Sequence, residues 1–184
     1  GALEALYRSI ELLRTGPDAE PAPGTILNIG NAYRCFGNLE LALQNYEKAL
    51  AGFEKMRAPG GIATATLNIG SIYAETGQFK VSKEYLLKAQ LLRERLNPNE
   101  SLTLEQLARV SSALGEDADA LEYSKRAIDR CRKIPDANCM ASGQVTLSNL
   151  YCRLSDPSRA LEAGIEAVDL SIKYSFESEL VEAQ

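Results

Sequence analysis

The sequence of 184 residues contains no histidine. This absence removes the commonest general base, the Ser–His and Cys–His nucleophile pairs and the commonest zinc ligand. Carboxylates are plentiful, as at Glu116, Asp117 and Asp119, but such residues are typical of the solvated face of an amphipathic helix. A phosphate-binding loop is missing too, because Pro59-Gly60-Gly61 lacks a following Lys-Ser or Lys-Thr. We therefore expect no enzymatic activity and no bound cofactor.

Long apolar runs and an excess of positive charge are also missing. No apolar stretch reaches about 18 residues and no charged-then-apolar leader is present, so we expect no membrane association and a cytoplasmic location. The formal net charge is −5 and the pI is about 5.0. Proteins that bind nucleic acid need a net basic face, so we expect this chain to bind no nucleic acid. The basic clusters at 93–95 and 125–133 are interpreted as outward, solvated faces.

The four cysteines, Cys35, Cys131, Cys139 and Cys152, show no CxxC spacing. With no histidine to complete a ligand set, we expect no metal site, and we expect reduced thiols rather than a disulfide. Only Cys131 and Cys139, which flank one short loop, could approach each other.

A repeated pattern is the dominant feature that is present. The stretch from Asn28 to Leu50 returns 40 residues later, as in the steps from Gly30 to Gly70 and from Gly37 to Gly77. Third and fourth copies follow at steps of 38 and 40, as from Gly77 to Gly115 and from Ala120 to Ala160. Repeats of this period indicate stacked supersecondary units.

The pattern resembles the tetratricopeptide repeat. The resemblance covers nearly the whole chain and rests on four features: a small residue after an apolar one, a tyrosine three places on, a turn glycine (Gly37, Gly77 and Gly115), and small residues in the second half of the unit. The other three features are carried by the following residues. These are Gly30, Gly70 and Ala108; Tyr33, Tyr73 and Tyr151; and Ala42, Ala49, Ala89, Ala120, Ala127, Ala160 and Ala167. The step of 40 exceeds the usual period of about 34, and this long form is similar to the repeats of kinesin light chains, of spindle-orientation adaptors that bind G-protein subunits, and of regulatory domains in some bacterial transcription activators. The resemblance implies an all-α, right-handed superhelical solenoid of antiparallel helix pairs.

Apolar spacing at three and four residues predicts first helices near 25–36, 62–76, 102–114 and 142–154, and second helices near 2–14, 39–56, 79–96, 117–133 and 157–174. We predict one array over 1–184, with a truncated repeat and linker at 1–22, repeats at 23–61, 62–100, 101–140 and 141–177, and the start of a further repeat at 178–184. These cut units suggest a piece of a longer protein.

Breakers mark the turns of this array. Pro59-Gly60-Gly61 is predicted to form a loop between repeats. The glycines at 37, 77 and 115 are predicted to end helices in the left-handed conformation. Ser155 takes that place in the fourth copy, at a cost of about 1 kcal/mol, and Asp156-Pro157 then provides a cap and a first-turn proline. Ser111 for tyrosine and Gly164 for an aromatic residue or leucine predict looser third and fourth repeats.

The resemblance implies a concave groove lined by the first helices. Side chains there that the helix pair does not use for packing are the predicted peptide-binding residues: Leu27, Asn31, Arg34, Leu67, Ser71, Glu75, Glu105, Arg109, Val145, Asn149 and Arg153. Asparagine can pair with a peptide backbone, and arginine can bind a carboxylate with two bonds. The alternative is that asparagines bridge helices. For Asn31 and Asn149 this alternative is as strong as peptide binding, and for Asn28 and Asn68 it is stronger.

One subfamily clamps the C-terminal carboxylate of chaperones with lysine and asparagine. Asn31 and Arg109 match that pattern, but its lysine sites are Leu27 and Glu105 and its second asparagine is Ser71. An acid there repels an incoming carboxylate, so this clamp is not expected. Leu27, Leu67 and Val145 instead suggest a partly apolar ligand such as an amphipathic helix.

We therefore predict a non-catalytic module that binds a protein or peptide segment in its concave groove, as a fragment of a larger scaffold or regulatory protein. One alternative is a sensory domain that responds to a peptide or small ligand and controls a separate effector domain. Another is self-association through the repeat ends, where Leu3, Leu6, Leu180 and Val181 would expose apolar surface.

Overall fold

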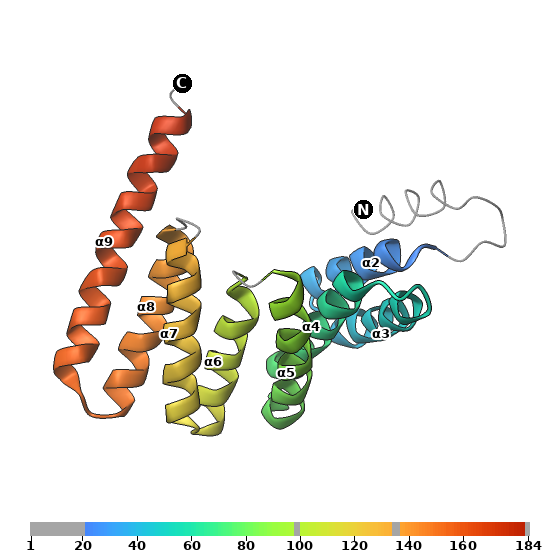
Figure 1. Cartoon of the computed structure of the whole chain (residues 1–184), viewed down its shortest axis with the longest axis horizontal. Helices are drawn as coiled ribbons and strands as arrows, with labels where there is room; N and C mark the ends of the chain where they lie inside the picture. The colour runs from blue at the N-terminus through green and yellow to red at the C-terminus, as the bar shows by residue number, and fades with distance from the viewer. Residues whose placement is uncertain (1–20, 98–99, 134–136, 183–184) are drawn as a thin grey trace. The chain divides into compact units, whose positions relative to one another are not determined.

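The computed structural model describes residues 21–97, 100–133 and 137–182, and within these ranges the chain is all helical, without a strand (Figure 1). The helices are α2 (Pro23–Cys35), α3 (Leu39–Lys55), α4 (Pro59–Glu75), α5 (Phe79–Leu96), α6 (Leu102–Leu114), α7 (Asp117–Lys133), α8 (Ala137–Arg153) and α9 (Pro157–Glu182). This confirms the all-α repeat fold. The chain divides into two compact units, Gly1–Leu92 and Arg93–Gln184. The helix predicted at 2–14 lies outside the described residues, and the assignment of residues to repeats stays a prediction.

Three predicted helix boundaries are wrong. Pro59-Gly60-Gly61 is not a loop, because α4 begins at Pro59, where a proline lacking an N–H is well suited to the first helical position. Gly61 is needed there, since a Cβ at this position would lie 2.2 Å from the ring of Phe53. Helix α8 begins at Ala137 rather than near 142. Helix α9 passes through 174 and 178 without interruption because no glycine or proline follows Gly164, so neither the predicted end near 174 nor a new element beginning at 178 is found.

The turn residues behave as predicted. Gly37, Gly77 and Gly115 have φ of 76°, 77° and 78°, and Ser155 joins them in the left-handed region with φ of 57°. Asp156 Oδ1 accepts a hydrogen bond from Arg159 N at 3.2 Å, which caps the first turn of α9.

Replacing Ser155 with glycine is expected to raise the free energy of unfolding of the second unit by about 0.5–1 kcal/mol, because glycine adopts positive φ without steric cost. Urea unfolding followed by circular dichroism measures the change. Ser142→Gly, at an exposed position inside α8, is the matched control and is expected to destabilise by a similar amount. A loss of stability in Ser155→Gly would contradict the strain assigned to this turn.

Each unit packs small residues against large ones, as the sequence predicts. In the first unit the buried cluster contains Ala42, Tyr46, Ile69 and Ile72. Gly30 of α2 lets the ring of Tyr46 approach, since a Cβ there would lie 2.6 Å from Tyr46 Cε1. In the second unit the cluster contains Ile128, Leu147, Tyr151, Ala160 and Ala163. The predicted small residues of the second helices, from Ala42 to Ala167, are all buried.

The cysteine expectation is wrong for one pair. Cys131 of α7 and Cys139 of α8 form a disulfide, with their Cα atoms 5.8 Å apart. These residues meet because the helices that carry them pack against each other across the short connection. Cys35 and Cys152 are free and exposed, as expected for reduced thiols.

Candidate functional site

Asn31, a predicted peptide contact, ties three helices of the first unit together. Its Oδ1 accepts a hydrogen bond from Tyr46 OH of α3 at 2.8 Å and another from Asn68 Nδ2 of α4 at 3.2 Å. The bridging alternative therefore describes Asn31 and Asn68, although the side chain of Asn31 is also exposed at the surface. Burial raises the pKa of Tyr46, and the nearby charge of Arg34 opposes that rise.

Arg34 and Glu75, both predicted contacts, pair with each other. Arg34 Nε donates to Glu75 Oε1 at 2.8 Å, and Arg34 Nη2 lies 2.5 Å from the same oxygen. Both side chains are 37% exposed, so solvent screening limits the pair to less than about 1 kcal/mol. The pair joins the C-terminal ends of α2 and α4.

Two predicted contacts are not on the surface at all. Leu67 and Ser71 are 3% and 4% exposed, and Ser71 Oγ donates to Leu67 O at 3.0 Å. Helix α4 contacts helices on more than one side. Helix α3 packs against it, and Ser82 Oγ of α5 donates a hydrogen bond to Gly70 O at 2.7 Å. Leu27 is half-buried against the same core. The prediction that these side chains face a ligand is therefore wrong for Leu67 and Ser71.

In the second unit, Arg153 is engaged in the same way as Arg34. Its Nη1 donates to Ser112 O and contacts Ser112 Oγ, both at 2.6 Å, and its Nη2 donates to Asp117 Oδ1 at 2.7 Å. Arg109 is exposed, and its Nη2 donates to Gln106 Oε1 one turn away. Glu105 Oε1 accepts a hydrogen bond from Ser101 Oγ at 3.0 Å and lies 3.3 Å from Cys139 Sγ.

Val145 and Asn149 are the predicted contacts that line an open hollow. They lie on α8, and Val145 is 50% exposed. The hollow has a volume of about 360 Å³ and is lined by Val145, Ser148, Asn149, Gly164, Ala167, Val168, Ser171 and Ile172. A second hollow of about 510 Å³ shares Ser148, Gly164 and Val168 with the first and continues along α9 to Leu161 and Ile165. We call this combined surface the α8–α9 hollow.

Gly164 provides the space for the α8–α9 hollow. In the other copies its place is taken by Tyr46, Leu86 and Ser124, all of which are buried. In the fourth copy the residue at this place, Gly164, has no side chain to fill that volume. The sequence identified this departure but predicted only looser packing from it.

The sequence interpretation missed the apolar stripe beside the hollow. Leu161, Ile165, Val168 and Ile172 of α9 are 66%, 54%, 58% and 51% exposed. Their spacing of four, three and four residues is that of a face that packs against another helix. This spacing was visible in the sequence, but the sequence analysis did not single it out.

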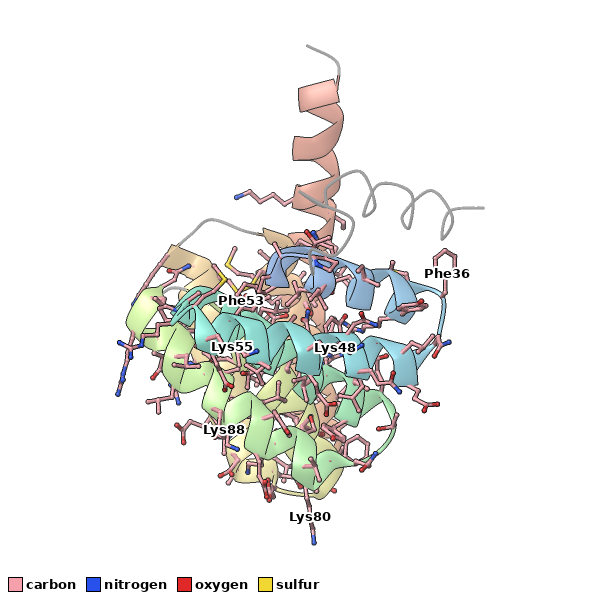
Figure 2. The ribbon with its side chains drawn as sticks, turned by 90° about the vertical axis from the view of Figure 1, so that its right-hand side faces the viewer. Phe36, Lys48, Phe53, Lys55, Lys80 and Lys88 are labelled. Carbon is pink, nitrogen blue, oxygen red and sulfur yellow. A yellow bond between two sulfur atoms is a disulfide. The ribbon has the colours of Figure 1, made fainter. Side chains whose placement is uncertain are left out.

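The basic clusters are largely paired. Arg126 Nη2 and Arg130 Nη2 both bond to Glu94 Oε1, at 2.7 and 2.8 Å. Lys48 and Lys55 of α3 and Lys80 and Lys88 of α5 are exposed, and Lys80 points into solvent from the start of α5 (Figure 2). Across the described helices, none has the length and apolar character needed to cross a membrane.

Models of the tetratricopeptide repeat match residues 24–56 and 61–133, which together make up more than half of the chain. The chain belongs to the tetratricopeptide repeat family. Repeats of this family generally mediate protein–protein interaction and are generally not catalytic. The exposed apolar stripe of α9 therefore lies on a fold whose members generally bind proteins.

Two curated relatives are outer dynein arm-docking complex subunit 4 of Xenopus laevis and of Danio rerio. Each is 27% identical to this tetratricopeptide chain, over 77% and 91% of its length. The matches span only 26% and 37% of those relatives. The relatives' activities as whole proteins therefore do not transfer to this chain.

Solved structures share the fold. BtubC of P. vanneervenii superposes with a TM-score of 0.78 at 19% identity, covering 94% of this chain and 71% of that one. A putative kinesin light chain of Podosopora anserina, with nearly identical repeats, superposes with a TM-score of 0.72 at 18% identity, covering 95% and 87%. MamA superposes with a TM-score of 0.70 at 17% identity, covering 95% and 90%. At these identities the likeness describes the fold alone.

Proposed function

We propose that this tetratricopeptide chain is a non-catalytic interaction module that binds an amphipathic helix of a partner protein along the α8–α9 hollow, as part of a larger scaffold or regulatory protein. The observation that carries the proposal is the exposed stripe of α9 beside the space left by Gly164. An aliphatic side chain of the partner would fill that space, and neighbouring anchors would cover the stripe.

The other copies support a helix as the occupant. Leu43 and Leu50 of α3 occupy the places of Leu161 and Val168, and both pack against the core cluster that includes Ile69 and Ile72 of the following α4. In α7 the same places are Leu121 and Ile128, which pack with Leu147 and Tyr151 of the following α8. Side chains at these places thus form, in this fold, a surface that fits an antiparallel helix.

The rim of the hollow indicates the partner's polar face. Glu162 and Asp169 are exposed on α9, and Asp169 lines the second hollow. Asn149, which lines the first hollow, offers an amide that can both donate and accept. We propose that the partner helix carries aliphatic anchors at positions three and four apart, flanked by lysine or arginine.

The other exposed predicted contacts, Asn31, Glu75, Arg109 and Arg153, remain proposed contacts for a peptide in the concave groove of the family. The relatives named as subunits of a docking complex support a scaffold role. A cytoplasmic location likewise stays a prediction.

A photo-crosslinking side chain placed at Val168 tests the proposal. In lysate of the source organism, mass spectrometry of the crosslinked peptides is expected to identify one partner helix with the spacing described above. Ile165→Asp in the same chain is expected to reduce the crosslink at least tenfold, because a carboxylate would enter the apolar contact. A crosslinker at Lys80 with the same chemistry is the control for surface proximity. Crosslinks spread over unrelated sequences, or unchanged by Ile165→Asp, would refute the proposal.

Two other results would point elsewhere. Crosslinks from Val168 to a second copy of this chain, with a mass that grows with concentration, would replace the proposal with self-association. The volumes of the two hollows, about 360 and 510 Å³, fall in the size range of small-molecule sites and favour ligand sensing as a second candidate. A small apolar molecule that raises the melting temperature, with no polypeptide doing so, would favour that candidate.

A further inference from the structure

Three potential metal ligands converge in the second unit, away from the α8–α9 hollow. They are Glu105 of α6, Cys131 of α7 and Cys139 of α8, and their ligand atoms all lie within 4.8 Å of one another. Cys131 is 3% exposed, while Glu105 and Cys139 are half-buried. Helices α6 and α7, and α7 and α8, pack directly against each other, so the packing of this unit brings the three side chains together.

Glu105 and Ser101 both contact the sulfur of Cys139. Glu105 Oε1 lies 3.3 Å from Cys139 Sγ, and Ser101 Oγ lies 3.0 Å from the same sulfur. A sulfur in a disulfide carries no proton, so the hydrogen bond that Glu105 Oε1 accepts here comes from Ser101 Oγ. A thiol would donate a hydrogen bond to the carboxylate, and a cation would attract both atoms.

We propose that, when the Cys131–Cys139 disulfide is reduced, Cys131, Cys139 and Glu105 bind one thiophilic divalent cation of the zinc class. Thiolate and carboxylate ligands at the distances that zinc prefers give tetrahedral separations of about 3.8 Å between sulfurs and about 3.5 Å between sulfur and oxygen. Reduction of the disulfide releases the two sulfurs to reach this separation, and the three ligand atoms already lie within 4.8 Å of one another. A water molecule beside Ser101 takes the fourth position.

A dithiol reductant converts the disulfide state into the reduced state that binds the cation. The dithiol gives two electrons and two protons to the Cys131–Cys139 bond and becomes a disulfide itself, leaving two protein thiols. The cation then displaces the two thiol protons. The disulfide joins α7 and α8, whereas the cation also holds α6. The proposal does not depend on the proposed partner helix.

Cobalt(II) is the probe for this site, because tetrahedral cobalt–thiolate centres absorb strongly. The full chain carrying Cys35→Ser and Cys152→Ser, which removes the two exposed thiols, is reduced with a dithiol, desalted under argon and titrated with cobalt and then zinc. We expect one cobalt per chain with a thiolate charge-transfer band, displacement of cobalt by zinc, and no band before reduction. Absence of the band in the reduced chain would overturn the proposal.

Two variants of this chain assign the ligands. Glu105→Gln keeps both thiols and is expected to weaken cobalt binding at least tenfold, since even groups that only orient a ligand contribute tens of fold. Cys139→Ser is expected to abolish the charge-transfer band. Circular dichroism checks that each variant is folded. Unchanged affinity in Glu105→Gln, or a band that survives Cys139→Ser, would contradict the assigned ligand set.

Discussion

Replacing Tyr46 with alanine is expected to lower the free energy of unfolding of the first unit by about 3–5 kcal/mol, the range for removing a buried aromatic side chain. Tyr46 is 0% exposed and is the largest fully buried side chain of the described core. The backbone of Gly30 lies directly against the ring of Tyr46, so removing the ring would leave a space beside Gly30 that no side chain at position 30 can fill. Urea unfolding followed by circular dichroism, with the two units fitted separately, measures the loss.

Tyr46→Phe is the matched control, since it keeps the ring and removes the hydroxyl that donates to Asn31. It is expected to cost about 1 kcal/mol. Burial raises the pKa of Tyr46, so folding favours the neutral phenol. The resulting contribution to stability is complete below the ordinary pKa of about 10 and is lost as the pH rises through the higher folded value. Tyr46→Phe should remove that alkaline loss. If alanine costs no more than phenylalanine, Tyr46 does not hold the first unit together.

Much of the fold could be predicted because each repeat contains residues that mark where its helices end. Left-handed turns require glycine or a tolerated substitute, so Gly37, Gly77, Gly115 and even Ser155 could be located from spacing alone. Small residues facing Tyr46 could be identified for the same reason. The failures occurred where one residue type serves two purposes. Proline and glycine at 59–61 begin a helix here, although the same residues commonly form a loop.

The site was predicted less well, because helical spacing shows which face a residue lies on but not what covers that face. Leu67 and Ser71 lie on the predicted face of α4 but are buried. Val145 and Asn149 lie on the equivalent face of α8 and are exposed. Nor could the sequence show that Cys131 and Cys139 are bonded, since their distance depends on how α7 and α8 pack. Long-range packing decides both questions.

The third repeat shows a further physical limit of sequence interpretation. Ser111 stands where the other copies have tyrosine, and Ser124 stands where the first two copies have Tyr46 and Leu86. Both hydroxyl oxygens are buried without a hydrogen-bond partner among the described residues. Spacing identified the substitution at Ser111 but could not show whether a neighbour would satisfy the hydroxyl. A buried unpaired hydroxyl destabilises its repeat by about 1–3 kcal/mol.

A larger side chain at position 164 should fill the α8–α9 hollow, and we expect it to weaken partner binding while stabilising the fold. Gly164→Leu is expected to weaken binding of the partner helix identified from Val168 at least tenfold, about 1.4 kcal/mol, because the new side chain occupies the space for the partner's anchor. The same change is expected to raise the free energy of unfolding by about 1 kcal/mol, since leucine favours a helix more than glycine does.

Gly164→Ala is the control for this prediction. A Cβ at position 164 would lie 3.4 Å from Ser148 Oγ, an ordinary contact, so alanine fits without closing the hollow. Alanine should therefore stabilise α9 by about the same amount while leaving partner affinity within about twofold, as expected for a change that adds helix propensity without altering the contact surface. Fluorescence titration gives the affinities, and urea unfolding gives the stabilities. If Gly164→Leu binds as tightly as Gly164→Ala, the space left by Gly164 is not where the partner's anchor lies, since only leucine removes it.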